Sequence, residues 1–160
     1  MRNLFLALAL LVSLVGYIFA EPTIFLVRHA EKASTGDPKD PDLSGAGRQR
    51  AESLAAMLKD AGITAIYATD LKRSQQTTEP LAKAASVEPT IVPAKDTAAL
   101  VAKLKEAKSN VLVVGHSNTL PEILKTLGVE SPPAIDEADY DNLFVLTPGS
   151  PTQLLRLHFR

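Results

Sequence analysis

Two of the three histidines in this 160-residue chain follow directly on its two strongest strand patterns. Val27-Arg28-His29 ends one apolar run, and Val114-Gly115-His116 ends another. Ligands bind at the carboxyl ends of strands in an open parallel sheet, so both imidazoles are expected at one sheet edge. Each histidine alone is better explained as a hydrogen-bonded group at a strand end. The pair, with Arg28 beside it, indicates a functional site. The third, His158, is expected on the surface of the last strand.

Two arginines indicate which ligand this edge would bind. Arg28 follows a buried strand, where an unpaired guanidinium is costly unless an anion satisfies it. Arg73 falls near the start of a predicted helix, where a cation opposes the helix macrodipole unless an anion is bound. Its simpler interpretation is a solvated residue of the first helical turn. Two arginines, two histidines and free helix N-termini after strands predict a phosphate site.

Several other chemistries lack the residues they need. The chain has no cysteine and no His-x-x-His or Glu-x-x-His pair, so we predict no metal site and no cofactor. No Gly-rich loop ending in Lys-Ser/Thr is present, and Ser117 lies outside any Gly-x-Ser-x-Gly turn. With 17 basic against 18 acidic residues and eight aromatics, a nucleic-acid partner is not expected.

The hydrophobic pattern predicts the elements that carry these residues. A β-α-β-α-β-α-β-α-β-β order specifies an α/β fold, a three-layer α/β/α sandwich with a mostly parallel sheet. The last two strands, joined by a Pro-Gly-Ser-Pro turn, are expected as a hairpin at the sheet edge. Ser44 and Asp96 are predicted helix N-caps, and Thr119 to Glu122 matches a capping box. Strands are expected at 23–27, 63–67, 90–92, 111–114, 142–146 and 154–159, with helices after Ser44, over 72–85, after Asp96 and from Thr119 to Gly128.

The N-terminal segment reads as a secretory signal. Arg2 precedes an apolar run from Leu4 to Ala20, which ends at Glu21-Pro22. We therefore expect residues 1–20 to be a signal peptide and residues 21–160 to be one domain. The expected location is the periplasm of a bacterium or the secreted fraction. An uncleaved anchor formed by residues 4–20 is the alternative, although the run is slightly short for a span.

Four segments resemble the motifs of the histidine phosphatase (phosphoglycerate-mutase-like) superfamily. Together they run in the order of that family from about residue 23 to residue 127. The segments are FLVRHAEK (25–32), LSGAGRQRA (43–51), YATDLKRSQQT (67–77) and VVGHSN (113–118).

The resemblance implies roles for four residues. His29 would be the nucleophile that accepts a phosphoryl group on nitrogen, and Arg28, Arg73 and His116 would hold the phosphate oxygens. Water would then hydrolyse the phosphohistidine. The family needs no metal, in agreement with the missing ligands. Ala30 replaces the signature glycine, as it does in small members of the family.

The residue that protonates the leaving group is less evident. In larger members a carboxylate between the second arginine motif and the second histidine has this role. Asp96 is the candidate in that interval, although its interpretation as a helix N-cap competes. Glu122 is accounted for by the capping box, and Glu31 lies near the nucleophile or in a loop. Without an acid, the enzyme would act on good leaving groups, such as phosphohistidine or an acyl phosphate.

These observations predict a small exported phosphatase for phosphate monoesters or phosphohistidine. The substrate would be a small phosphorylated molecule, such as an envelope sugar phosphate, or a phosphoprotein. A non-catalytic phosphate-binding module of the same fold is the main alternative. A mutase-type phosphotransferase or a structural domain with incidental histidines is less favoured. Substrate choice is expected to depend on the loop 33–43 and the segment 132–140.

Overall fold

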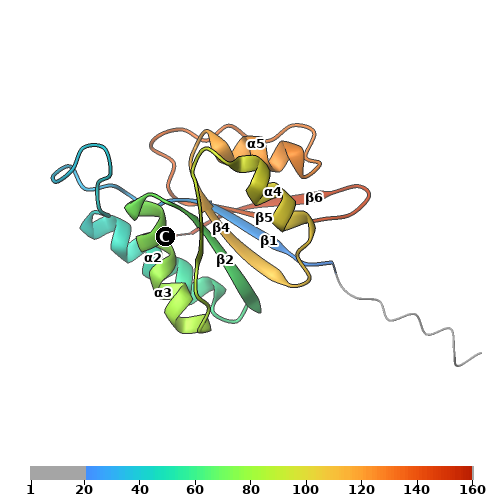
Figure 1. The fold of residues 1–160 in the computed structure, drawn as a ribbon, viewed down its shortest axis with the longest axis horizontal. Helices are drawn as coiled ribbons and strands as arrows, with labels where there is room; N and C mark the ends of the chain where they lie inside the picture. Colours follow the sequence, from blue (N-terminus) through green and yellow to red (C-terminus); the bar gives the residue numbers. More distant parts are fainter. Residues whose placement is uncertain (1–20, 160) are drawn as a thin grey trace, which may run out of the picture.

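The computed structural model describes residues 21–159 and shows one mixed sheet with helices on both faces (Figure 1). The predicted signal or anchor over residues 1–20 lies outside the described residues. The strands are β1 (Ile24–Arg28), β2 (Ile63–Thr69), β3 (Thr90–Val92), β4 (Asn110–Gly115), β5 (Asn142–Thr147) and β6 (Gln153–His158). The helices are α2 (Gly45–Leu58), α3 (Lys72–Ala85), α4 (Thr97–Lys105) and α5 (Thr119–Thr126).

The strand order is β3-β2-β4-β1-β5-β6. The first four strands in this order pair in parallel, whereas β5 runs antiparallel to β1 and β6 antiparallel to β5. The predicted mostly parallel sheet with a C-terminal edge hairpin is therefore confirmed. β1 and β4 are direct neighbours, with Arg28 in register with Gly115, so the residues that follow these two strands emerge side by side.

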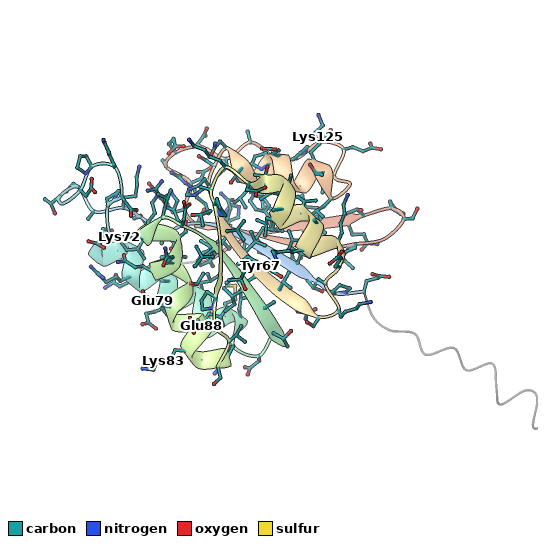
Figure 2. The ribbon with its side chains drawn as sticks, viewed as in Figure 1. Tyr67, Lys72, Glu79, Lys83, Glu88 and Lys125 are labelled. Carbon is teal, nitrogen blue, oxygen red and sulfur yellow. The ribbon has the colours of Figure 1, made fainter. Side chains whose placement is uncertain are left out.

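The helices complete a three-layer sandwich. In Figure 1, α2 and α3 lie on one face of the sheet, and α4 and α5 lie on the other. Leu54 and Leu81 pack beneath the first pair, and Leu104 and Ile123 beneath the second, in two separate apolar clusters. The central strands are buried from both sides, which explains their continuous apolar sequence. Figure 2 shows the exposed charges of the covering helices at the periphery, as with Glu79, Lys83 and Lys125.

Helix α2 is fixed against the segment that follows β1. Ser44 caps the helix by accepting a hydrogen bond from the Gly47 backbone N–H at 3.0 Å, as the sequence predicts. A Cβ atom at Gly47 would lie 2.3 Å from the carbonyl oxygen of Glu31. The glycine therefore allows the first turn of α2 to approach the backbone two residues after His29.

The predicted capping box at the start of α5 is wrong. Asn118 is the N-cap residue and makes no side-chain capping bond. The Thr119 hydroxyl accepts a hydrogen bond from the His116 backbone N–H at 3.1 Å, and the Glu122 carboxylate accepts one from Thr97 at 2.8 Å. The Thr119 hydroxyl is therefore bonded within the turn that carries His116, and the Glu122 carboxylate is bonded to the neighbouring helix α4.

The edge strand β6 is more exposed than its apolar sequence suggests. Leu155 and Leu157 are exposed, whereas Phe159 is buried against α2. His158 is on the surface, as expected, with Nδ1 3.2 Å from the carboxylate of Asp141. Among residues 21–159, no helix has the length and apolar character that a membrane span requires.

Candidate active site

A cavity of about 290 Å³ opens at the carboxyl ends of the parallel strands. It brings together the two histidines and the two arginines that the sequence singles out: Arg28, His29, Arg73 and His116. The rings of the two histidines lie edge to face, with their centroids 5.2 Å apart. The remaining lining comes from the segments that follow β1, β2, β3 and β4 and from the loop between α5 and β5: Lys32, Leu71, Ala94, Lys95, Ser117, Asn118, Thr119 and Glu137.

His29 is held as a neutral imidazole with a defined tautomer. Its Nδ1 lies 2.8 Å from the Ala30 carbonyl oxygen, which can only accept, so Nδ1 carries the proton. The lone pair is then on Nε2. Burial lowers the pKa of His29 to about 3, and the charges of His116, Arg73 and Arg28 act in the same direction. The hydrogen bond to Ala30 opposes this shift but does not reverse it. At neutral pH, His29 has the form that a nucleophile requires.

His116 is oriented by the end of β2. Its Nε2 lies 3.0 Å from the hydroxyl oxygen of Thr69, which donates its own hydrogen to Ser74 at 2.7 Å. The Thr69 oxygen is therefore free to accept from His116 Nε2–H. Burial lowers the pKa of His116 to about 4, and the charges of Arg73 and Arg28 add to the effect. The ring is fixed without being charged at neutral pH.

Arg28 is almost fully buried and is held on one side by residues 136–140. Its Nη1 donates to the carbonyl oxygens of Asp136 at 3.0 Å and Asp139 at 3.5 Å. Its Nη2 lies 2.6 Å from the Glu137 carboxylate, and the guanidinium carbon lies 4.3 Å from the centre of the Tyr140 ring. The Glu137 carboxylate thus supplies part of the negative charge that stabilises the buried Arg28 guanidinium.

Both arginines keep one unsatisfied donor. Among residues 21–159, the buried Nε atoms of Arg28 and Arg73 have no hydrogen-bond partner. A buried N–H without a partner is costly, and an oxyanion in the cavity that both side chains line would satisfy it. Arg73 has only a distant carboxylate nearby, with Nη1 4.0 Å from Asp40. The pair is therefore suited to bind phosphate.

Thr77 links helix α3 to the segment that carries His29. Its hydroxyl accepts a hydrogen bond from the Ala30 backbone N–H at 3.0 Å and donates to the Arg73 carbonyl oxygen at 2.7 Å. One buried side chain thus links the residue after His29 to the backbone of the second arginine. The order Arg73…Thr77 places both groups on successive turns of α3.

The carboxylates that the sequence offered as proton donors lie elsewhere. Asp96 caps α4 by accepting from the Ala99 N–H at 3.0 Å, and it is outside the lining of the cavity that holds His29. Glu31 binds Arg50, with a shortest distance of 2.6 Å. Burial opposes ionisation of Glu31, but the Arg50 hydrogen bonds lower its pKa. Glu122 is bonded to Thr97 in the groove between α4 and α5.

Glu137 is the functional candidate that sequence reasoning missed. Of the carboxylates in the described part of the chain, it alone lines the cavity. It accepts a short hydrogen bond from the Ser117 hydroxyl in addition to its bond with Arg28. The sequence signal was only its place in the segment 132–140. The loop 33–43 contributes no lining residue, although its Asp40 carboxylate accepts from the Lys72 N–H at the start of α3.

No group of three or more metal-ligating side chains is found within residues 21–159. The Ser117 hydroxyl donates a hydrogen bond to the Glu137 carboxylate.

Comparisons with known proteins agree with this fold. Residues 24–95 match the model of the histidine phosphatase superfamily (branch 1). The 8-oxo-(d)GTP phosphatase of Mycolicibacterium smegmatis is 40% identical over 65 residues, which are 38% of this chain and 20% of that protein. The chain thus spans about a fifth of the length of that curated relative.

Solved structures extend the likeness beyond the family match. The protein histidine phosphatase SixA, complexed with tungstate, is similar with a TM-score of 0.71 and 18% identity, over 85% of this chain and 96% of that one. A SixA-like protein from Agrobacterium tumefaciens gives a TM-score of 0.64 with 22% identity, over 84% and 97%. A mycobacterial glucosyl-3-phosphoglycerate phosphatase gives 0.68 with 13% identity, over 86% and 97%. At these identities the likeness concerns the fold.

The strand order and the cavity define an α/β domain that carries two histidines and two arginines at the carboxyl edge of its parallel strands. Over residues 24–95 the chain matches the histidine phosphatase superfamily, and its fold is similar to that of the solved histidine phosphatase SixA.

Proposed function

We propose that this protein is a phosphatase that hydrolyses phosphate monoesters or phosphohistidine through a phosphohistidine intermediate on His29. The observation that carries the proposal is the state of His29, a buried neutral imidazole with its proton fixed on Nδ1. It lies in one cavity with two guanidinium groups, each with an unpaired buried N–H. A nucleophilic lone pair beside unsatisfied positive donors suits attack on phosphorus.

The first step transfers the phosphoryl group to the protein. His29 Nε2 attacks phosphorus as the P–O ester bond breaks, and the leaving oxygen departs with the bonding pair. Arg28 and Arg73 stabilise the charge on the equatorial oxygens, and His116 lines the same cavity. The Ala30 carbonyl, which accepts from Nδ1–H, stabilises the positive charge that develops on the phosphorylated ring.

The second step regenerates the imidazole. A water oxygen attacks phosphorus, the N–P bond breaks, and its electron pair returns to Nε2 while the water loses a proton. Inorganic phosphate is the product. No residue role in either step requires a metal ion or cofactor, and we include metal independence in the proposal.

The cavity lining favours substrates with good leaving groups. Lys95 lines the cavity beyond β3, whereas Asp96 caps α4. Glu137, the lining carboxylate, is ionised by its partners: the hydrogen bond from Ser117, followed by the charge of Arg28, lowers its pKa. An ionised carboxylate cannot protonate a leaving group. Phosphohistidine, acyl phosphates and aryl phosphates should therefore be hydrolysed faster than alkyl phosphates.

The apolar N-terminal segment supports a location outside the cytoplasm. Arg2 and the run from Leu4 to Ala20 have the order of a secretory signal. We include export to the periplasm or medium in the proposal, with retention by residues 4–20 as the alternative.

The test is hydrolysis of p-nitrophenyl phosphate by the purified protein in the presence of EDTA. The wild type should be active, and His29→Asn should lose activity by about 10⁴-fold or more, as expected for removal of a nucleophile. His158→Asn, a change of the exposed histidine, is the matched control and should retain full activity. Phosphate binding without hydrolysis would favour a non-catalytic binding module instead.

A further inference from the structure

A single loop contacts the Arg28 guanidinium on the side that bears Nη1 and Nη2. Two backbone carbonyls, the Tyr140 ring and the Glu137 carboxylate all come from residues 136–140. These residues are more than 100 positions away from Arg28 in sequence. The buried guanidinium, with 2% of its side chain exposed, therefore takes its partners from a loop on the surface.

Glu137 differs from the other partners in its exposure. Its side chain is 76% exposed, and yet its two oxygens are bonded to Arg28 and to Ser117. It bridges the residue that ends β1 and a residue two positions beyond the end of β4. An anion thus already lies in the cavity that we propose binds phosphate.

We propose that Glu137 is a specificity-determining residue whose carboxylate competes with the phosphoryl group for the Arg28 guanidinium. It would weaken the binding of inorganic phosphate and so promote release of the product. This inference rests on the proposed phosphate-binding role of Arg28. It assigns to the loop 136–140 a direct effect on affinity.

Competition is favoured over a positioning role by the remaining partners of Arg28. Without the Glu137 carboxylate, Arg28 would still be held by the Asp136 and Asp139 carbonyls and by Tyr140. Its burial leaves the side chain little freedom to move. By contrast, the carboxylate repels an incoming dianion, and within a partly enclosed cavity such repulsion is substantial.

The experiment measures binding of inorganic phosphate to the purified protein by isothermal titration calorimetry. Glu137→Gln should bind phosphate about tenfold more tightly than the wild type, because one like charge is removed at short range. Glu137→Ala should bind more tightly as well, since removal of the charge is common to both variants. Glu130→Gln, the same change at an exposed residue outside the cavity lining, should leave the affinity unchanged.

Two results would overturn the inference. Equal or weaker phosphate binding by both Glu137 variants would mean that the carboxylate positions Arg28 instead of competing for it. No phosphate binding by any of the proteins would mean that the cavity does not take this ligand. If the variants bind more tightly while the wild type hydrolyses no phosphate ester, the proposed function fails and the inference stands.

Discussion

His29, the proposed nucleophile, depends on a single hydrogen bond for its tautomer. Because the Ala30 carbonyl accepts from His29 Nδ1–H, the lone pair is confined to Nε2. Burial and the positive charges of Arg73 and Arg28 keep the ring neutral over the physiological pH range. A histidine at the end of a buried strand is thereby prepared for attack without any charged partner on its second nitrogen.

The orientation of the second histidine can be tested at Thr69. Thr69→Val keeps the shape of the side chain but removes the oxygen that accepts from His116 Nε2. We expect kcat/KM for p-nitrophenyl phosphate to fall about tenfold, which corresponds to one hydrogen bond. Thr78→Val, which removes a hydroxyl bonded to the Gln75 carbonyl, should change kcat/KM little. Equal losses in both variants would point to a general effect on α3 and its neighbours.

At the residue scale, sequence predicted the partners that lie at strand ends. His29 and His116 follow apolar runs, and parallel strands bring such ends to one edge. Glu137 could not be identified from the sequence because its segment has no periodicity and because it lies 109 positions from its partner Arg28. Asp96 was predicted correctly as a cap, and that contact directs its carboxylate to the Ala99 N–H.

At the scale of the elements, the first turn of α2 approaches the segment that carries His29 closely. The segment 43–51, which resembles a motif of the histidine phosphatase superfamily, contains the two residues that permit this approach. The Ser44 hydroxyl caps the helix, and Gly47 leaves room for the Glu31 carbonyl oxygen. Helix α2 is in turn held against α3, which carries Arg73.

Substitution at two glycines of this helix should have opposite effects on stability. Gly47→Ala would place Cβ 2.3 Å from the Glu31 oxygen, and we expect a loss of about 2 kcal/mol in the free energy of unfolding. Gly45→Ala meets nothing within 4 Å and should gain up to about 1 kcal/mol from helix propensity. Urea denaturation measures both. A neutral Gly47→Ala would mean that the α2 backbone moves away without cost.

Element positions were largely predictable, and the exception is caused by tertiary hydrogen bonds. Thr119 and Glu122 have the spacing of a capping box, but in the folded chain both side chains form hydrogen bonds with other groups. The tertiary partners are a backbone N–H of His116 and the Thr97 hydroxyl. Sequence spacing shows which side chains are able to cap a helix but not which competing donors surround them.

At the scale of the whole molecule, the site couples folding to pH. The two buried histidines have pKa values of about 3 and about 4 in the folded protein, compared with 6.5 for an unperturbed imidazole. Between the folded-state pKa values and 6.5, the unfolded chain binds more protons than the folded one. Stability therefore rises with pH through this window and is lost as pH falls from about 6.5 toward 4.

This dependence can be measured by thermal or urea unfolding between pH 7 and pH 4.5. The wild type should lose stability steadily on acidification over that range. His29→Asn should show a shallower slope, because one of the two histidines has been removed. His158→Asn, at the surface, should retain the wild-type slope. An identical slope in all three proteins would contradict the neutral buried state of His29.

The layered fold and the edge hairpin were predictable because parallel strands and covering helices alternate in the sequence. The exposure of the outer strand was not. Leu155 and Leu157 lie in the row of Val145 and Leu143 on the sheet, but α2 and α3 do not extend over this edge sufficiently to bury them. Coverage depends on where the helices lie across the sheet, which local patterns do not encode.

The central claim is that His29 carries the phosphoryl group. The most direct measurement is acid-free rapid quenching of the purified protein with p-nitrophenyl phosphate, followed by mass spectrometry of its peptides. The account predicts a phosphoryl adduct on the His29 ring that is stable to alkali, labile to acid and missing in His29→Asn. Hydrolysis by the wild type with no adduct on His29, or an adduct on another residue, would contradict it.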